Sequence, residues 1–168
     1  QCNVEPILHS DERPEFDEYR WATPRTLLDE WMANEIRLPP PLVMILRELL
    51  EDTIENSIAR MSSTPPRKNT RIEFGPGVEC LPLPTDTLPP STHTNCYVLG
   101  LPGGDRVIID PAAKCVDGLT QLQEKVDSVL KEGSTILGTI FTHRHQDHIG
   151  DLEAISHLYT APIWGSRE

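Results

Sequence analysis

The stretch 142–150 constrains this chain more than any other part of its sequence. Three of the six histidines and one carboxylate fall within six residues there: His143, His145, Asp147 and His148. They directly follow the apolar run 136–142, which predicts a buried strand. Because alternate side chains of a strand project to one side, His143 and His145 can face a common point. Imidazole nitrogens and carboxylate oxygens are ligands that zinc accepts, so the pattern predicts a metal site at a strand end.

A solvated polar loop that happens to be rich in histidine is the alternative interpretation. A single histidine would favour it, whereas four ligand-type residues within six positions favour metal binding. The other histidines carry no such pattern: His9 lies in an acidic lead-in, His93 in a Ser-Thr-His-Thr turn, and His157 on an expected helix. We expect those three to be structural or exposed.

The second half of the chain alternates between strand-like and helix-like patterns. Short apolar or alternating runs predict strands, and 3.6-residue apolar spacing over 116–130 predicts a helix that Gly133 ends. Another helix is expected after Gly150, and the proline-rich stretch 81–90 is expected to be a loop. The predicted strands are 72–74, 96–99, 107–109 and 136–142. Strand, helix, strand, helix in this order predicts a layered α/β structure.

The first 61 residues have a different character. Thr23-Pro24 predicts the start of a short helix over 24–34. The prolines 39–41 open a second helix, whose apolar spacing is sustained from Leu42 to Ile58. The polar, proline-containing stretch 62–71 predicts a linker, so we divide the chain into a helical segment 1–61, a linker 62–71 and an α/β domain 72–168.

Composition limits the partners and the compartment. The net charge is −11 and no basic stripe is present, which favours a small-molecule substrate over nucleic acid. No apolar run is long enough to span a bilayer, and no secretory signal is visible, so we expect no membrane partner. The four cysteines are widely spaced, which predicts reduced thiols in the cytoplasm, each serving as a small buried hydrophobe: Cys2, Cys80, Cys96 and Cys115.

The motif His143-x-His145-x-Asp147-His148 resembles the signature of the metallo-β-lactamase superfamily, the αβ/βα sandwich metallo-hydrolases. Upstream stretches match in the expected order: 94–99 (TNCYVL) is similar to the family's Thr-Asn-x-Tyr strand, and 107–110 (VIID) to the strand that ends in an aspartate near the metals. The resemblance covers residues 72–168. It is closest to the branch of glyoxalase-II-type hydrolases and lactamase-like endoribonucleases, and it implies the N-terminal half of the sandwich, preceded by a mainly helical segment.

The resemblance also implies roles for individual residues. His143 and His145 would bind a first zinc ion, and Asp147 and His148 a second, with Asp147 also orienting the nucleophile. Asp110 would orient the ligands from behind. The implied reaction is attack of a zinc-activated hydroxide on an ester, thioester or phosphodiester. One departure is local: the family has glycine two places after the aspartate, where this chain has Ala112.

A larger departure concerns the rest of the site. The family completes its site with a histidine, an aspartate and a last histidine in the C-terminal half, and no residues of this chain match them. We therefore expect a fragment that alone binds zinc weakly and is inactive, with a bare sheet face that self-associates. The alternative is an inactive metal-binding or interaction module. Separately, Arg20-Trp21-x-x-Pro24 and the leucines after it are similar to the C-terminal tail of Nudix hydrolases, although a helical spacer that only packs explains them equally well.

Overall fold

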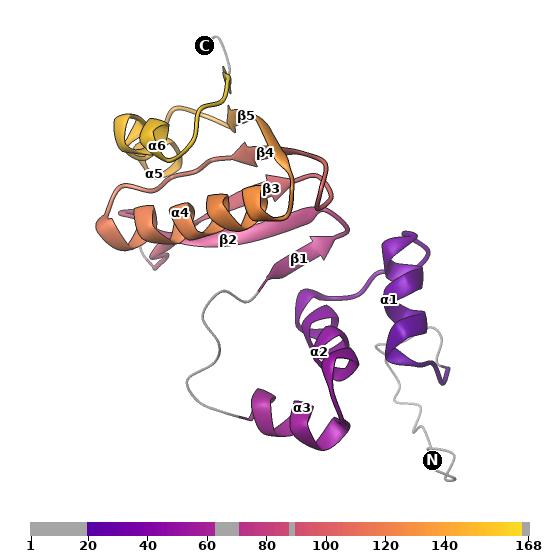
Figure 1. Ribbon diagram of the computed structural model, residues 1–168. Coiled ribbons are helices and arrows are strands. Elements are labelled where there is room, and N and C mark those ends of the chain that lie inside the picture. The colour runs from indigo at the N-terminus through magenta and orange to yellow at the C-terminus, as the bar shows by residue number, and fades with distance from the viewer. Residues whose placement is uncertain (1–19, 63–70, 88–89, 166–168) are drawn as a thin grey trace, which may run out of the picture.

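The computed structural model describes residues 20–62, 71–87 and 90–165 (Figure 1). Its helices are α1 (Pro24–Met32), α2 (Pro40–Glu51), α3 (Ile54–Met61), α4 (Val116–Lys131), α5 (Gln146–Ile149) and α6 (Leu152–Leu158). Its strands are β1 (Ile72–Gly75), β2 (Val78–Pro84), β3 (His93–Leu99), β4 (Asp105–Ile109), β5 (Thr135–Phe141) and β6 (Ile163–Gly165). The strands form one six-stranded sheet in sequence order. The predicted α/β class is confirmed.

The sheet is antiparallel at one end and parallel at the other. β1, β2, β3 and β4 pair antiparallel, whereas β4, β5 and β6 pair parallel. Parallel neighbours need a crossover, and α4 supplies it between β4 and β5. The predicted helix over 116–130 is therefore confirmed, and Gly133, at φ 79°, follows its C-cap. The helix expected after Gly150 is α6.

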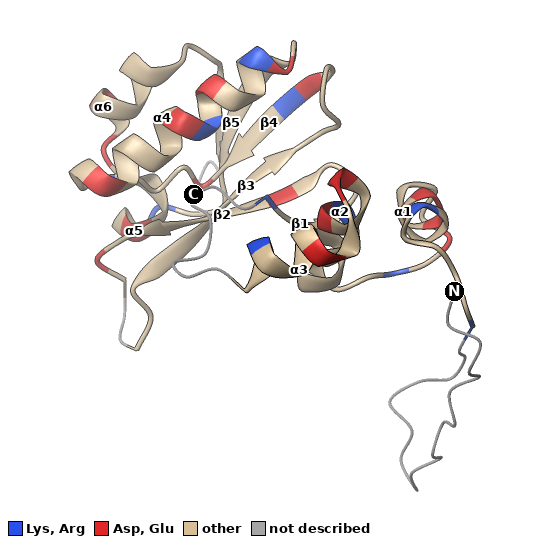
Figure 2. Cartoon of the chain, turned by 60° about the horizontal axis from the view of Figure 1, so that its bottom comes forward, with Lys and Arg blue, Asp and Glu red and all other residues tan. Residues whose placement is uncertain are grey.

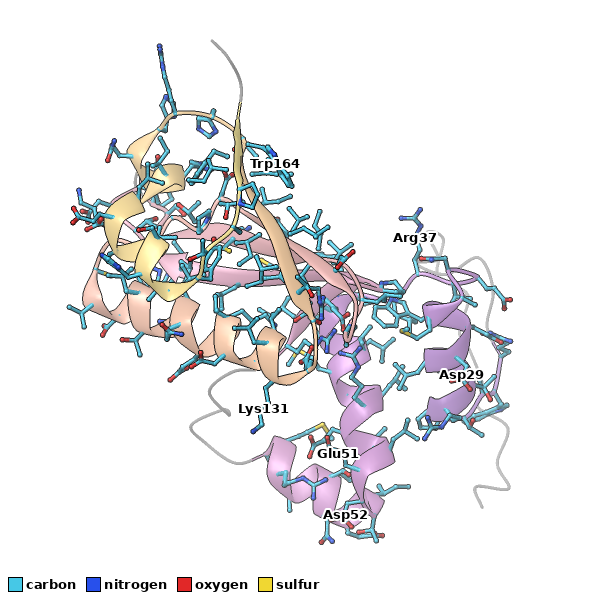
Figure 3. All side chains as sticks on the ribbon, turned by 45° about the horizontal axis from the view of Figure 1, so that its top comes forward. Asp29, Arg37, Glu51, Asp52, Lys131 and Trp164 are labelled. Carbon is cyan, nitrogen blue, oxygen red and sulfur yellow. The ribbon has the colours of Figure 1, made fainter. Side chains whose placement is uncertain are left out.

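The main core lies between the sheet and the helices α4 and α6 (Figure 1). It contains side chains from β2, β3, β4, α4 and α6, among them Leu83, Cys96, Val98, Ile108, Leu122, Val126 and Ile155. The opposite face of the sheet carries aromatic side chains that remain about half exposed, namely Phe74 at 56% and Trp164 at 47%. Trp164 is labelled in Figure 3. Phe74 contacts Tyr97 there, with ring centroids 6.5 Å apart.

The helices α1, α2 and α3 lie beyond the β1 edge of the sheet (Figure 2). They have a small core of their own, formed by Leu28, Trp31, Val43 and Leu46. Arg47 connects this core to the sheet, because its guanidinium lies 5.4 Å from the ring centroid of Trp31 and forms an ion pair with the buried Glu73 of β1. The predicted linker spans 62–71, of which residues 63–70 lie outside the described residues, so the linker and the domain boundaries stay a prediction.

The second predicted helix is two helices, so that prediction is wrong in one respect. α2 ends at Glu51, and α3 begins at Ile54. The break lies at Asp52 and Thr53: Asp52 is extended and accepts a hydrogen bond from Thr53 N, and the Thr53 side chain caps α3 through Asn56 N (Figure 3). Side-chain capping competes with the continuous helical ladder here, and apolar spacing alone does not reveal it.

The predicted loop 81–90 is also partly wrong, because residues 81–84 belong to β2. β1 pairs only with the first residues of β2, up to Cys80. Among the described residues nothing pairs with that side of β2 beyond Cys80, and proline's missing N–H costs no ladder hydrogen bond at such an edge. Pro82 and Pro84 therefore remain in the strand and pair in register with β3.

The cysteine prediction holds for two of the three described residues. Cys80 and Cys96 are buried and free, and burial raises the pKa of both thiols. Cys115 is exposed, and its sulfur caps α4 by accepting a hydrogen bond from Gly118 N. The prediction of a buried hydrophobe is wrong there, because the position precedes a helix that needs an N-cap acceptor. Cys2 lies outside the described residues.

A cluster of buried charges joins β1, β2, β4 and α4. Glu73, Glu79 and Arg106 are each at most 2% exposed. Glu79 pairs with Arg106 at 3.0 Å, with Arg71 at 2.9 Å, and with Lys125 of α4. Burial raises the pKa of Glu79, but the hydrogen bond from Lys125 and the nearby positive charges outweigh it, so the net pKa lies below its usual value. The carboxylate is therefore held in its charged form.

Candidate functional site

The candidate site lies where two parallel strands end side by side. β4 ends at Ile109 and β5 at Phe141. Asp110 N donates to Ile140 O at 2.9 Å, which extends the ladder by one residue and sets Asp110 next to Thr142. Carboxyl ends of parallel strands meet at one edge of a sheet, where α/β folds carry their binding loops.

Asp110 is the best-connected side chain at this edge. Its Oδ1 accepts from Thr142 N at 2.8 Å, and its Oδ2 accepts from the Thr142 hydroxyl at 2.6 Å. The same Oδ2 lies 2.9 Å from His148 Nδ1. The carboxylate is buried, at 4% exposed, and its backbone adopts φ 46°, which aspartate tolerates better than most residues. These contacts place Asp110 beside Thr142 and His148, and its role in orienting metal ligands stays a prediction.

Three of the four motif residues gather in front of Asp110. The rings of His143 and His148 have centroids 4.1 Å apart, and those of His143 and His145 are 4.6 Å apart. His143 Nε2 lies 3.1 Å from His145 Nδ1, and His143 Nδ1 lies 2.9 Å from the Thr142 hydroxyl. The three imidazoles of the motif thus lie together beyond the end of β5, whereas the expectation that Asp147 joins them stays a prediction.

These contacts assign the protons on two of the rings. The Thr142 hydroxyl gives its proton to Asp110, so its oxygen accepts from His143 Nδ1–H. His148 Nδ1–H likewise donates to Asp110. Whenever these rings are neutral, Nε2 is then the unprotonated nitrogen, which is the form that binds a metal ion. The buried carboxylate of Asp110 thus orients two imidazoles, that of His148 directly and that of His143 through the Thr142 hydroxyl.

The backbone after β5 reverses within a few residues. His145 precedes α5, and its carbonyl accepts from His148 N at 3.0 Å. Ala112 N donates to His148 O at 3.2 Å and joins this turn to the loop after β4. Gly150, at φ 69°, packs so closely that a Cβ there would lie 2.4 Å from Ala113 O. Ala112 itself adopts φ 47°, the left-handed region that favours the glycine expected at this position.

Asp147 takes a different partner from the histidines. A hydrogen bond from the Thr87 side chain lowers the pKa of Asp147 below its usual value, and the charges of His148 and His145 act in the same direction. Thr87 lies in the loop that follows β2. The carboxylate of Asp147 is therefore ionised at neutral pH.

Sequence reasoning missed two residues of this arrangement. Thr142 connects Asp110 to His143, and Thr87 contacts Asp147. Thr142 has a usable signal, because it sits between the strand and the first histidine, whereas nothing in the proline-rich loop distinguishes Thr87. His93 and His157 are exposed and lie outside the cluster, as expected, and His9 lies outside the described residues.

The donors fit part of a metal site. Two nitrogens bound to one tetrahedral zinc at 2.0–2.1 Å lie about 3.3 Å apart, close to the 3.1 Å between His143 Nε2 and His145 Nδ1. Within residues 20–62, 71–87 and 90–165, however, no group of three or more His, Cys, Asp or Glu side chains is placed to hold an ion. The described residues thus supply a converging pair of donors and not a closed ligand set.

A cavity of about 520 Å³ opens beside the histidines. Its polar wall consists of Thr142, His143, Arg144 and His145, and its apolar wall of Phe141, Ile149, Leu152 and Ile163. A site of this size next to titratable groups suits a small molecule.

No helix within the described part of the chain is long and apolar enough to cross a membrane.

One comparison with known proteins bears on this site. Residues 89–168 match the family model of the metallo-beta-lactamase superfamily. The match contains Asp110 and all four residues of the histidine motif, and it points to a metal-dependent hydrolase. No curated protein matches the chain.

Proposed function

We propose that this chain carries half of the catalytic site of a two-zinc hydrolase that acts on an ester, thioester or phosphodiester. His143 and His145 would hold one ion, Asp147 and His148 the other, and the remaining donors would come from outside the described residues. The observation that carries the proposal is the pair of facing nitrogens, His143 Nε2 and His145 Nδ1, beside a histidine oriented by Asp110. The superfamily match over the same residues supports it.

The residues of this chain divide the work between them. When bound, zinc supplies Lewis acidity that lowers the pKa of water toward neutrality and polarises a carbonyl or phosphoryl oxygen. Asp110 and Thr142 keep Nε2 of His143 and of His148 unprotonated and fix the orientation of both rings. Asp147, whose pKa the hydrogen bond from Thr87 lowers further below neutrality, adds the negative charge that a nitrogen-only set lacks.

We also propose the wider setting. A net charge of −11 disfavours a polyanionic substrate, so a small molecule is preferred over nucleic acid. The free cysteines of the described residues agree with a reducing, cytoplasmic compartment. The exposed aromatic face that includes Phe74 and Trp164 favours self-association of the chain. The glyoxalase-II-like branch and a Nudix-like tail over residues 1–61 stay predictions.

Zinc binding to the purified chain tests the proposal. We expect weak binding in equilibrium dialysis, because two donors per ion hold it poorly. His143→Ala together with His145→Ala should abolish this binding, whereas the exposed His157→Ala on α6 serves as the matched control and should bind like the parent. Binding that is insensitive to the double substitution would contradict the ligand assignment.

An inactive metal-binding or interaction module remains the second candidate. The observation that favours it is that no described third donor joins either pair. A longer chain that supplies the missing metal ligands would distinguish the two candidates. Turnover that a chelator abolishes would support the hydrolase, whereas tight zinc binding without turnover would support the module. Two tightly held zinc ions and turnover in the 168-residue chain alone would show that its site is complete.

A further inference from the structure

A second, smaller cavity adjoins the one beside the histidines. The first has a volume of about 520 Å³ and the second about 100 Å³. They share an apolar wall formed by Phe141, Leu152 and Ile163. We call the two cavities together the acyl groove. It runs from the histidine pair, along the space between β5, β6 and α6, to Tyr159.

The two ends of the acyl groove differ in chemistry. The smaller cavity, which we call the deep end because it lies away from the histidines, is lined by Ile155, Tyr159 and Ala161 and also by the hydroxyl-bearing residues Thr139, Ser156 and Thr160. The Tyr159 hydroxyl is hydrogen-bonded to the Thr139 hydroxyl at 2.8 Å. Burial raises the pKa of Tyr159 to about 12, so this end offers no charge to a ligand. The deep end therefore suits hydrocarbon.

The mouth carries the only lysine or arginine among the lining residues of either cavity, Arg144. Within the part of the chain that the structure describes, its guanidinium has no hydrogen-bond or ion-pair partner. Arg144 lines the same cavity as His143 and His145, so an anionic group bound there lies beside all three side chains. One cation next to an apolar groove suits a ligand with a single charge, and a phosphodiester chain would need several.

We propose that the acyl groove selects the substrate as a carboxylic ester or thioester with a linear hydrocarbon acyl chain. This rests on the proposed hydrolase function and narrows its three substrate classes to two. The acyl chain lies along Phe141, Leu152 and Ile163 toward Tyr159, and the carbonyl lies at the histidine pair. Water adds to the carbonyl carbon, the bond from that carbon to oxygen or sulfur breaks, and the leaving group takes up a proton. A carboxylic acid and an alcohol or thiol result, with no redox change.

The test measures binding and not turnover, so it is independent of whether the metal site is complete. Straight-chain carboxylates from butanoate to dodecanoate, the products of the proposed reaction, are titrated calorimetrically into the metal-free 168-residue chain. Burial of each added CH₂ should tighten binding by about two- to fourfold until the groove is filled. An affinity that does not change with chain length would overturn the proposal.

Two variants separate the ends of the groove. Ala161→Phe places a ring in the deep cavity, so the gain should stop at a shorter chain while butanoate binds as before. Arg144→Gln should weaken every carboxylate by a similar factor, about tenfold, and leave the dependence on chain length intact. The control is Leu101→Gln, which changes a leucine that is 52% exposed and lines neither cavity. An unchanged profile in Ala161→Phe would refute the assignment of the deep cavity.

Two further titrations identify the ester class. The octanoyl thioester of N-acetylcysteamine and its oxoester analogue share one acyl chain, and the tighter binder identifies the preferred class. Failure of this inference remains distinguishable from failure of the proposed function, because zinc binding is measured on the same samples. If zinc binding depends on His143 and His145 but the affinity for carboxylates does not change with chain length, the acyl-groove proposal is rejected and the proposed hydrolase function is not.

Discussion

Removal of the Asp110 carboxylate should destabilise the protein more than any other single change at the site. Asp110→Ala deletes the acceptor of three hydrogen bonds, from Thr142 N, the Thr142 hydroxyl and His148 Nδ1. Hydrogen bonds to a charged group contribute about 1.5–3 kcal/mol each. Thr142 and His148 are partly exposed, so water replaces some of this, while alanine at φ 46° adds about 1–2 kcal/mol of strain. We expect a total loss of about 3–5 kcal/mol in the free energy of unfolding.

Asp110→Asn separates stability from the protonation of the rings. Asparagine tolerates the same φ and keeps one acceptor oxygen, so the loss should be only about 1–2 kcal/mol. Its amide, however, donates to His148 Nδ1 where the carboxylate accepted. His148 must then carry its proton on Nε2 and can no longer bind a metal ion through that nitrogen.

Two measurements check these expectations. Urea unfolding followed by circular dichroism gives the stabilities, and ¹⁵N NMR of the imidazoles gives the tautomers. The reasoning about Asp110 is refuted if Asp110→Ala costs less than about 1 kcal/mol, or if Asp110→Asn leaves His148 with its proton on Nδ1.

Two further substitutions test other parts of the fold. Glu79→Gln should lower the free energy of unfolding by about 3 kcal/mol near neutral pH, because it leaves the buried cations uncompensated. The pKa of Glu79 is lowered on folding, so the stability that its carboxylate contributes is present above the usual pKa and is lost as pH falls through the lowered value. The difference in urea unfolding between the variant and the parent should therefore shrink toward about pH 3. A difference that stays constant with pH would show that Glu79 is not held ionised. Gly150→Ala should cost about 3 kcal/mol or more, because its Cβ would meet Ala113 O at 2.4 Å, whereas Gly133→Ala, with a similar φ of 79° and nothing within 4 Å, should cost only about 1–2 kcal/mol. Equal losses in the two glycine variants would rule out the backbone contact as the cause.

Sequence patterns predicted those elements of the fold whose stability is local. α4 has sixteen residues of regular apolar spacing between a capping residue and a glycine, and its predicted extent is close to that observed. Patterns failed where a neighbour determines the structure. Residues 81–84 form a strand because β3 pairs with them while β1 stops short, and a proline-rich sequence carries no sign of either fact. β6, a three-residue strand too short to show a pattern, pairs with β5 within the described part of the chain.

The site shows the same division between local and distant contacts. The motif residues lie within six positions of one another, so their clustering follows from one strand end and one tight turn. The partner of Asp147 comes from a loop sixty residues earlier, and no periodicity or spacing connects Thr87 to it. Asp110 lies between these cases: its place at the end of a predicted strand put it near the histidines, but only the structure shows which ring it contacts.

The arrangement around Asp110 separates preparation of the ligands from closure of the metal site. Ring orientation and protonation depend on Asp110, Thr142 and the parallel pairing of β4 with β5. Closure needs further donors, which the described residues do not provide. Oriented imidazoles lose less conformational entropy on binding than free ones, so donors supplied from elsewhere would complete a prepared half-site. Substitution of Asp110 should therefore weaken zinc binding even though Asp110 is not itself proposed as a ligand.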